Sequence, residues 1–130
     1  LIEPAVCTQY FYNLDKSRLL EFDSQFQQVD LNDDRRYYEL DFSFHSWLVS
    51  AAKNQTLDAF FHSLMQLQYR FSMYTVRMGT AVKGDFYTEH HEIIEALLSE
   101  DLERLGRVLV SHANYSEVIA LRTLIAAQIS

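Results

Sequence analysis

Three histidines and one aspartate occupy positions that the apolar pattern assigns to the protein interior. Asp41 and His45 lie four residues apart on a stripe of otherwise apolar residues, so both side chains point to the same side of a helix. His90 falls in the apolar row of the segment 85–98, and His112 falls in the apolar row of the segment 101–128. An uncompensated buried carboxylate costs several kcal/mol, and one shared cation would satisfy all four groups. The pattern therefore predicts a metal centre formed by Asp41, His45, His90 and His112.

The donor set indicates which metals would suit such a centre. Three imidazole nitrogens and one carboxylate oxygen favour a divalent transition metal, with Zn²⁺ as the first choice and Ni²⁺, Co²⁺ or Mn²⁺ as further candidates. Ca²⁺ would require more oxygen ligands. Four protein ligands leave one or two positions of a five- or six-coordinate ion open, so a small molecule could bind there.

Two other interpretations of the same residues stay open at this point. The histidines could be satisfied core residues of a plain dimerisation bundle. A metal with open positions could also activate a water, as in a metal-dependent hydrolase whose site has three histidines and one aspartate. The hydrolase interpretation lacks a clear general base, because Glu89 and Glu92 are expected to face away from the row that contains His90.

The remaining histidines do not extend the site. His62 and His91 lie off the metal-facing rows and are expected to be exposed or hydrogen-bonded. The segment that begins at His91 starts like the zinc-protease helix, but that motif needs a second histidine where Glu95 stands. No histidine follows a glutamate by three residues, which excludes a ferritin-like di-iron site.

A second polar group lies on one face of the segment 56–78. Arg70 and Arg77 are two turns apart, with Tyr74 between them. Two arginines at this spacing could hold a carboxylate through bidentate hydrogen bonds, although such a pair is often simply solvated.

The elements that must position these residues are helices. The chain has 130 residues, of which 48% are hydrophobic, and this length suits one domain over residues 1–130. One proline and three glycines provide too few turns for a sandwich or barrel, so the sequence predicts an all-α fold. Capping residues before apolar-periodic stretches divide the chain into six helices, and the short loops favour an antiparallel bundle. The expected helices are 3–13, 15–29, 34–52, 56–78, 85–98 and 101–128.

Composition excludes several classes of protein. The lone Cys7 excludes a disulfide framework and a cysteine-rich zinc module. A formal net charge of −7 with dispersed basic residues argues against unaided DNA binding. No apolar run is long enough to span a bilayer and no signal sequence is evident, so we expect a cytoplasmic protein without membrane contact. Because the chain starts at Leu1 rather than Met, we expect it to be part of a longer protein.

Four sequence segments together resemble a known family. They are Tyr38-Glu39-Leu40-Asp41-Phe42-Ser43-Phe44-His45, Ala51-Ala52-Lys53-Asn54, Glu89-His90-His91-Glu92-Ile93, and finally His112. This combination resembles the FCD domain, the C-terminal effector-sensing domain of the FadR subfamily of GntR transcription regulators. The resemblance covers nearly the whole chain.

The resemblance carries expectations about fold, ligands and partners. It implies an antiparallel bundle of six or seven helices, a homodimer, and DNA binding only through an N-terminal winged helix-turn-helix domain that is absent from this chain. It implies the same four metal ligands and a pocket for a small organic acid such as a hydroxy acid, sugar acid or dicarboxylate. In that setting Arg70, with Arg77, Tyr74 and Asn114, would bind the far end of the effector. The protein would then be a metal-dependent sensor and no enzyme.

Overall fold

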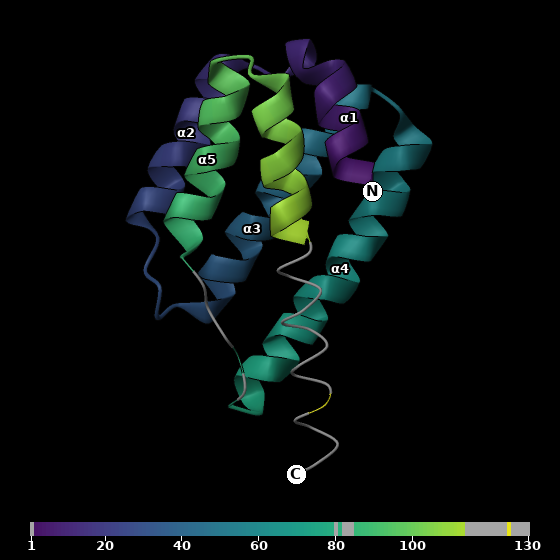
Figure 1. The fold of residues 1–130 in the computed structure, drawn as a ribbon. Coiled ribbons are helices and arrows are strands. Elements are labelled where there is room, and N and C mark those ends of the chain that lie inside the picture. Colours follow the sequence, from purple (N-terminus) through teal and green to yellow (C-terminus); the bar gives the residue numbers. More distant parts are fainter. Residues whose placement is uncertain (1, 80, 82–84, 114–124, 126–130) are drawn as a thin grey trace.

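The computed structural model describes residues 2–79, 81, 85–113 and 125, and these residues contain helices and turns but no strand (Figure 1). This architecture confirms the predicted all-α fold. Six α-helices follow one another along the described part of the chain, and two short 3-10 helices extend the first and third. In chain order they are α1 (Ile2–Tyr10), η1 (Phe11–Asn13), α2 (Lys16–Gln28), α3 (Asp34–Val49), η2 (Ser50–Ala52), α4 (Gln55–Arg77), α5 (Phe86–Leu98) and a last helix over 102–113.

Side-chain caps begin the helices where the sequence predicts breaks. Asp15 accepts a hydrogen bond from the backbone N–H of Ser17 at 2.9 Å, and Asn54 accepts one from Leu57 at 3.0 Å. These caps satisfy N–H groups that have no partner within the helix. Three further aspartates act in the same way: Asp33, Asp85 and Asp101.

Two helix ends differ from the prediction. The helix expected over 3–13 is α-helical only to Tyr10, and the one expected over 34–52 only to Val49. In both cases the chain tightens into a 3-10 turn, a common way to satisfy the last carbonyl groups. Lys53 then adopts the left-handed conformation, with φ of 51°, which stops the helix. The expected segment 101–128 is helical over 102–113, and its remainder lies outside the described residues except for residue 125.

The helices pack so that α3 lies in the middle of the bundle. It packs against α1 and α4, while α2 packs against α5 (Figure 1). The helix over 102–113 runs beside α5 in the same view. In the described part of the chain no helix is long and apolar enough to cross a membrane.

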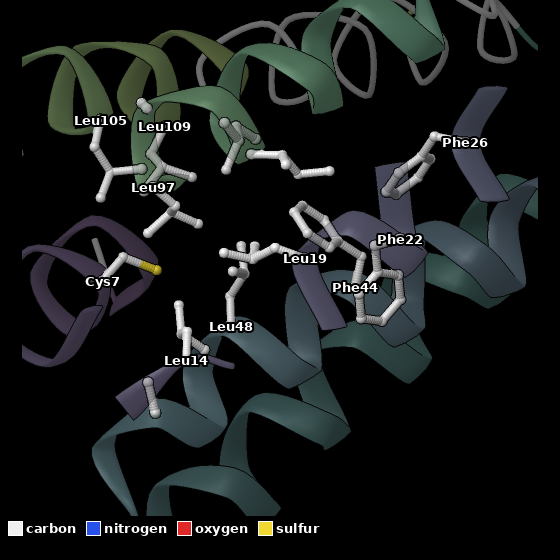
Figure 2. Packing of buried hydrophobic residues seen from close by; sticks show 14 of the residues in the cluster. Cys7, Leu14, Leu19, Phe22, Phe26, Phe44, Leu48, Leu97, Leu105 and Leu109 are labelled. Carbon is white, nitrogen blue, oxygen red and sulfur yellow. The ribbon is translucent and has the colours of Figure 1, made fainter. Parts of the chain in front are cut away.

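The core is a cluster of aromatic and aliphatic side chains between these helices (Figure 2). Phe44 of α3 is fully buried, and its ring centroid lies 5.1 Å from those of Phe22 and Phe26 on α2. Cys7 is also fully buried, and burial raises the pKa of its thiol, so it behaves as a small core residue. A smaller cluster of Val49, Phe61 and Met65 attaches α4 to α3. The aromatic cluster reaches the histidines of the candidate site.

Candidate metal centre

The four predicted ligands meet in one place. Asp41 and His45 come from α3, His90 from α5 and His112 from the helix over 102–113. Each offers one ligand atom, and these four atoms lie within 4.8 Å of one another. The convergence of three helices on one point, which the sequence could only suggest, is confirmed.

The carboxylate of Asp41 is at the centre of the cluster. Its Oδ1 atom lies 2.8 Å from Nε2 of His90 and 3.1 Å from Nε2 of His45. The side chains of His45 and His90 are 3% and 1% exposed, so water has little access to either ring. These are the surroundings in which a carboxylate needs a positively charged partner.

Groups outside the cluster fix which nitrogen of the His45 ring and of the His90 ring faces inward. Nδ1 of His90 donates a hydrogen bond to the backbone carbonyl of Phe86 at 2.7 Å, and a carbonyl oxygen can only accept. Nδ1 of His45 lies 2.6 Å from Oε1 of Glu3, a carboxylate that holds this ring in the same way. Hydrogen bonds of this kind orient metal-binding histidines and leave Nε2 free to act as a ligand.

Several nitrogens of the cluster are short of hydrogen-bond partners. A neutral His90 with its hydrogen on Nδ1 presents a lone pair at Nε2 to the Asp41 carboxylate, which is repulsive unless a proton or a metal cation lies between them. Nε2 of His45 and Nδ1 of His112 are buried and form no hydrogen bond of acceptable geometry. Buried polar atoms without a partner are rare in folded proteins. A cation with nitrogen and oxygen ligands would satisfy all of them, so the residues fit a metal.

The charges of the site without a metal follow from its contacts. Burial disfavours the charged carboxylate, yet the rings of His45 and His90 hold the pKa of Asp41 well below its usual range. Burial also opposes the charge on His45, but Glu3 and Asp41 raise the pKa of His45 well above its usual range. Burial lowers the pKa of His90. The metal-free centre is therefore a negative Asp41 that holds a proton on His45, beside a neutral His90.

Stacking fixes the rings in place. The ring of Phe26 stacks on that of His90, with centroids 4.1 Å apart and planes inclined by 16°. His45 and His112 stack at 5.0 Å and 13°. Phe44 contacts His45 and His90 edge to face. A ligand set held by packed aromatic rings is positioned before any ligand binds.

Two acidic residues at the site differ from the sequence interpretation. Glu3 was not among the predicted residues, because nothing in the local pattern links it to His45, 42 positions away. Glu89 was expected to face away from the site, but its Oε2 atom lies 3.5 Å from Nδ1 of His112. That expectation was wrong because it considered only the row of α5 that contains His90, whereas His112 comes from a different helix and lies beside Glu89. Glu92 is exposed, as expected.

The other two histidines lie away from the cluster, as the sequence predicted. Nδ1 of His91 is 2.7 Å from Oδ1 of Asp23 on α2, and its ring stacks on Tyr87. His62 is exposed on α4, with its ring against Phe42. His90 and His91 therefore have separate roles although they are adjacent in sequence.

The predicted effector-binding residues that the structure describes lie on the surface of α4. Arg70, Tyr74 and Arg77 are exposed on α4, and Asn114 lies outside the described residues. Arg70 lines a pocket of about 530 Å³ between α3 and α4. Ser43 also lines this pocket. It lies two residues after Asp41, and two residues turn a helix by about 200°, so Ser43 is on the opposite side of α3 from Asp41. A role for these four residues in effector binding stays a prediction.

The fold and the site define a class: a helical bundle that brings three histidines and an aspartate together in its interior as a candidate metal and ligand site. The chain matches the family model of the FCD domain over residues 1–115, and it belongs to this family. The FCD domain is the C-terminal effector-binding domain of GntR-type regulators. Comparison with curated proteins and with solved structures gave no significant match. FCD domains are regulatory ligand-binding domains and not enzymes, so the hydrolase interpretation is set aside.

Proposed function

We propose that this domain is a metal-dependent sensor of small carboxylates in a GntR-family transcription regulator. The single observation that carries the proposal is the meeting of four ligand atoms within 4.8 Å, with buried nitrogens that lack hydrogen-bond partners. Asp41, His45, His90 and His112 would hold the ion, with Zn²⁺ as our first choice and Ni²⁺, Co²⁺ or Mn²⁺ as further candidates. When bound, the metal supplies a positive charge to which the carboxylate of an organic acid can bind.

The chain's own residues would orient the effector and exclude water. The buried aromatic rings around His45 and His90 keep the local dielectric low, which strengthens the attraction for an anion. Arg70 and Arg77, with Tyr74 and Asn114, stay the candidates that the sequence offers for the far end of a hydroxy acid, sugar acid or dicarboxylate. Arg70 lines a pocket on the side of α3 opposite Asp41, so this role requires the effector to reach beyond the metal centre.

The N-terminal helix is well placed to transmit a signal from the site. Glu3 of α1 contacts His45 directly, so a change at the metal centre alters a contact of this helix. We propose that α1 connects to a winged helix-turn-helix domain outside this chain, that the working unit is a cytoplasmic homodimer, and that DNA binds only through that other domain. A 100-fold change in operator affinity requires about 2.7 kcal/mol of difference between two states of the protein.

Metal analysis and a ligand screen test the proposal. We expect one transition-metal ion per chain, and a member of an organic-acid library that raises the melting temperature. Saturation at a hundredfold excess over the dissociation constant adds about 2.7 kcal/mol of stability. The same acid should have no effect after the metal is removed with a chelator. Absence of stoichiometric metal, with no thermal shift on chelation, would favour the plain dimerisation bundle instead.

A further inference from the structure

The pocket of about 530 Å³ between α3 and α4 is separate from the metal centre. Its α3 wall contains Phe42 and Ser43, and its α4 wall contains Gln66 and Tyr69. Ser43 is rotated by about 200° around α3 from Asp41, so this wall faces away from the metal ligands. A pocket of this volume can hold a small organic molecule. We call it the α3–α4 pocket.

The charged side chains of the pocket leave one arginine available for a ligand. Arg35, Glu39 and Arg70 line it, and two arginines with one glutamate give a net positive lining in a chain whose formal net charge is −7. Nε of Arg35 lies 3.1 Å from Oε1 of Glu39, and this carboxylate, together with Tyr69, raises the pKa of Arg35. The side chain of Arg70 forms no ion pair or hydrogen bond with the residues that the structure describes. A guanidinium without a partner can bind a carboxylate through two parallel hydrogen bonds.

Aromatic rings from both helices form the apolar part of the lining. Phe42 and Tyr69 are each partly buried, and the ring of Phe42 is positioned by an edge-to-face contact with His62, with centroids 5.0 Å apart. Ser43 and Gln66 are exposed and add groups that can donate or accept hydrogen bonds. Ligand pockets commonly combine apolar walls with a few polar groups of this kind. The lining therefore suits a molecule with a flat apolar body and one anionic group.

A carboxylate fits the charge of the pocket better than a phosphate. A carboxylate carries one negative charge, which matches the net positive charge of the lining. A phosphate monoester carries about 1.5 to 2 negative charges at pH 7. Its additional charge would find no second free arginine in the lining, because Arg35 is already paired with Glu39.

We propose that the α3–α4 pocket is a second ligand site, which binds an aromatic carboxylate with its carboxylate on Arg70 and its ring against Phe42 and Tyr69. This inference goes beyond the proposed function, because the site uses none of the four metal ligands. It gives Arg70 a ligand of its own, whereas a role at the metal centre requires the effector to extend around α3. Since α3 contributes to both sites, a ligand in the pocket contacts the helix that carries Asp41 and His45.

Titration of the full 130-residue chain with 2-naphthoate, followed by calorimetry, tests the proposal. We expect a dissociation constant in the millimolar range or below. Acetate lacks the ring and 2-naphthol lacks the carboxylate, so each should bind at least about tenfold more weakly. Absence of 2-naphthoate binding, or tighter binding of 2-naphthyl phosphate than of 2-naphthoate, would overturn the proposal.

Two matched pairs of variants locate the binding. Arg70→Gln removes the free positive charge from the pocket, whereas Arg107→Gln removes one from an exposed arginine on the helix over 102–113. Gln66→Glu adds a negative charge to the pocket, whereas Gln68→Glu adds one to the same helix about 200° around its axis. We expect Arg70→Gln to weaken 2-naphthoate binding at least about tenfold and Gln66→Glu about fivefold, with both controls near the wild-type affinity. Equal affinities of Arg70→Gln and Arg107→Gln would overturn the proposal.

Removal of the metal separates this site from the metal centre. Chelator-treated wild type and the Asp41→Ala variant should both bind 2-naphthoate with the wild-type affinity, because none of the residues that line the pocket is a proposed metal ligand. A protein without stoichiometric metal that still binds 2-naphthoate would contradict the proposed function and leave the second site intact. Loss of 2-naphthoate binding in both metal-free samples would place the probe at the metal centre and overturn the second site.

Discussion

Removal of the Glu3 carboxylate should weaken metal binding although Glu3 is not itself a predicted ligand. Its Oε1 atom lies 2.6 Å from Nδ1 of His45, a contact that orients the ring and makes Nε2 more basic. Glu3→Ala leaves Nδ1 of a 3% exposed ring without a partner. Loss of such an outer contact costs about 10-fold to 100-fold in metal affinity, or about 1.4 to 2.7 kcal/mol.

A proton on His45 competes with the metal, so the loss of metal affinity in Glu3→Ala depends on pH. Glu3 also favours the proton that His45 must lose to bind a metal, because it raises the pKa of His45. Glu3→Ala removes the contact that favours metal binding and also the charge that favours the competing proton. Where His45 is protonated in the metal-free protein, the two losses have opposite effects on metal affinity and partly cancel. We therefore expect a smaller loss at about pH 7 than at about pH 8.5. Glu3→Gln keeps an acceptor oxygen without the charge and should lie between wild type and Glu3→Ala.

A competition titration of Zn²⁺ against a chromophoric chelator provides the measurement. Glu92→Ala is the matched control, because Glu92 is an exposed glutamate on α5, two residues from a ligand. Helicity and melting temperature of each metal-free variant report on folding. Equal Zn²⁺ affinities for wild type, Glu3→Ala and Glu92→Ala at both pH values would refute the role given to Glu3.

Three further experiments examine the metal centre and the core beside it. Asp41→Ala and His45→Ala should each abolish metal retention in elemental analysis while circular dichroism stays helical; retention of metal at wild-type stoichiometry would show that the ligand assignment is wrong. The metal affinity of the wild type should rise by up to about tenfold per pH unit between about pH 6.5 and the pKa of His45, because the metal displaces the His45 proton. The same proton stabilises the metal-free protein. That stabilisation is full below about pH 6.5 and is lost as the pH rises through the pKa of His45. A pH-independent affinity across this window would contradict the protonated His45. Phe44→Ala should lower the free energy of unfolding by about 3 to 5 kcal/mol in urea denaturation, because Phe44 is fully buried against two rings of α2; a loss under about 1 kcal/mol would argue against this core.

Local rules account for what could be predicted about this fold. Asp15 and Asn54 begin helices because a side-chain oxygen can satisfy a free N–H within three residues, an interaction visible in the sequence alone. The predicted ends of the helices were less accurate than the predicted starts. Whether Phe11 continues α1 or tightens into a 3-10 turn depends on how the following chain packs, and no residue near it decides the matter.

The sequence by itself determined the helical bundle and the four residues that could bind a metal. Helical periodicity fixes which side chains share a face, and a polar group on an apolar face must find a partner. Only the tertiary structure decided that Glu3 reaches His45, that Glu89 approaches His112 and that Arg70 lines a separate pocket. These contacts join helices distant in sequence, and their geometry is set by how the helices cross, which no local spacing encodes.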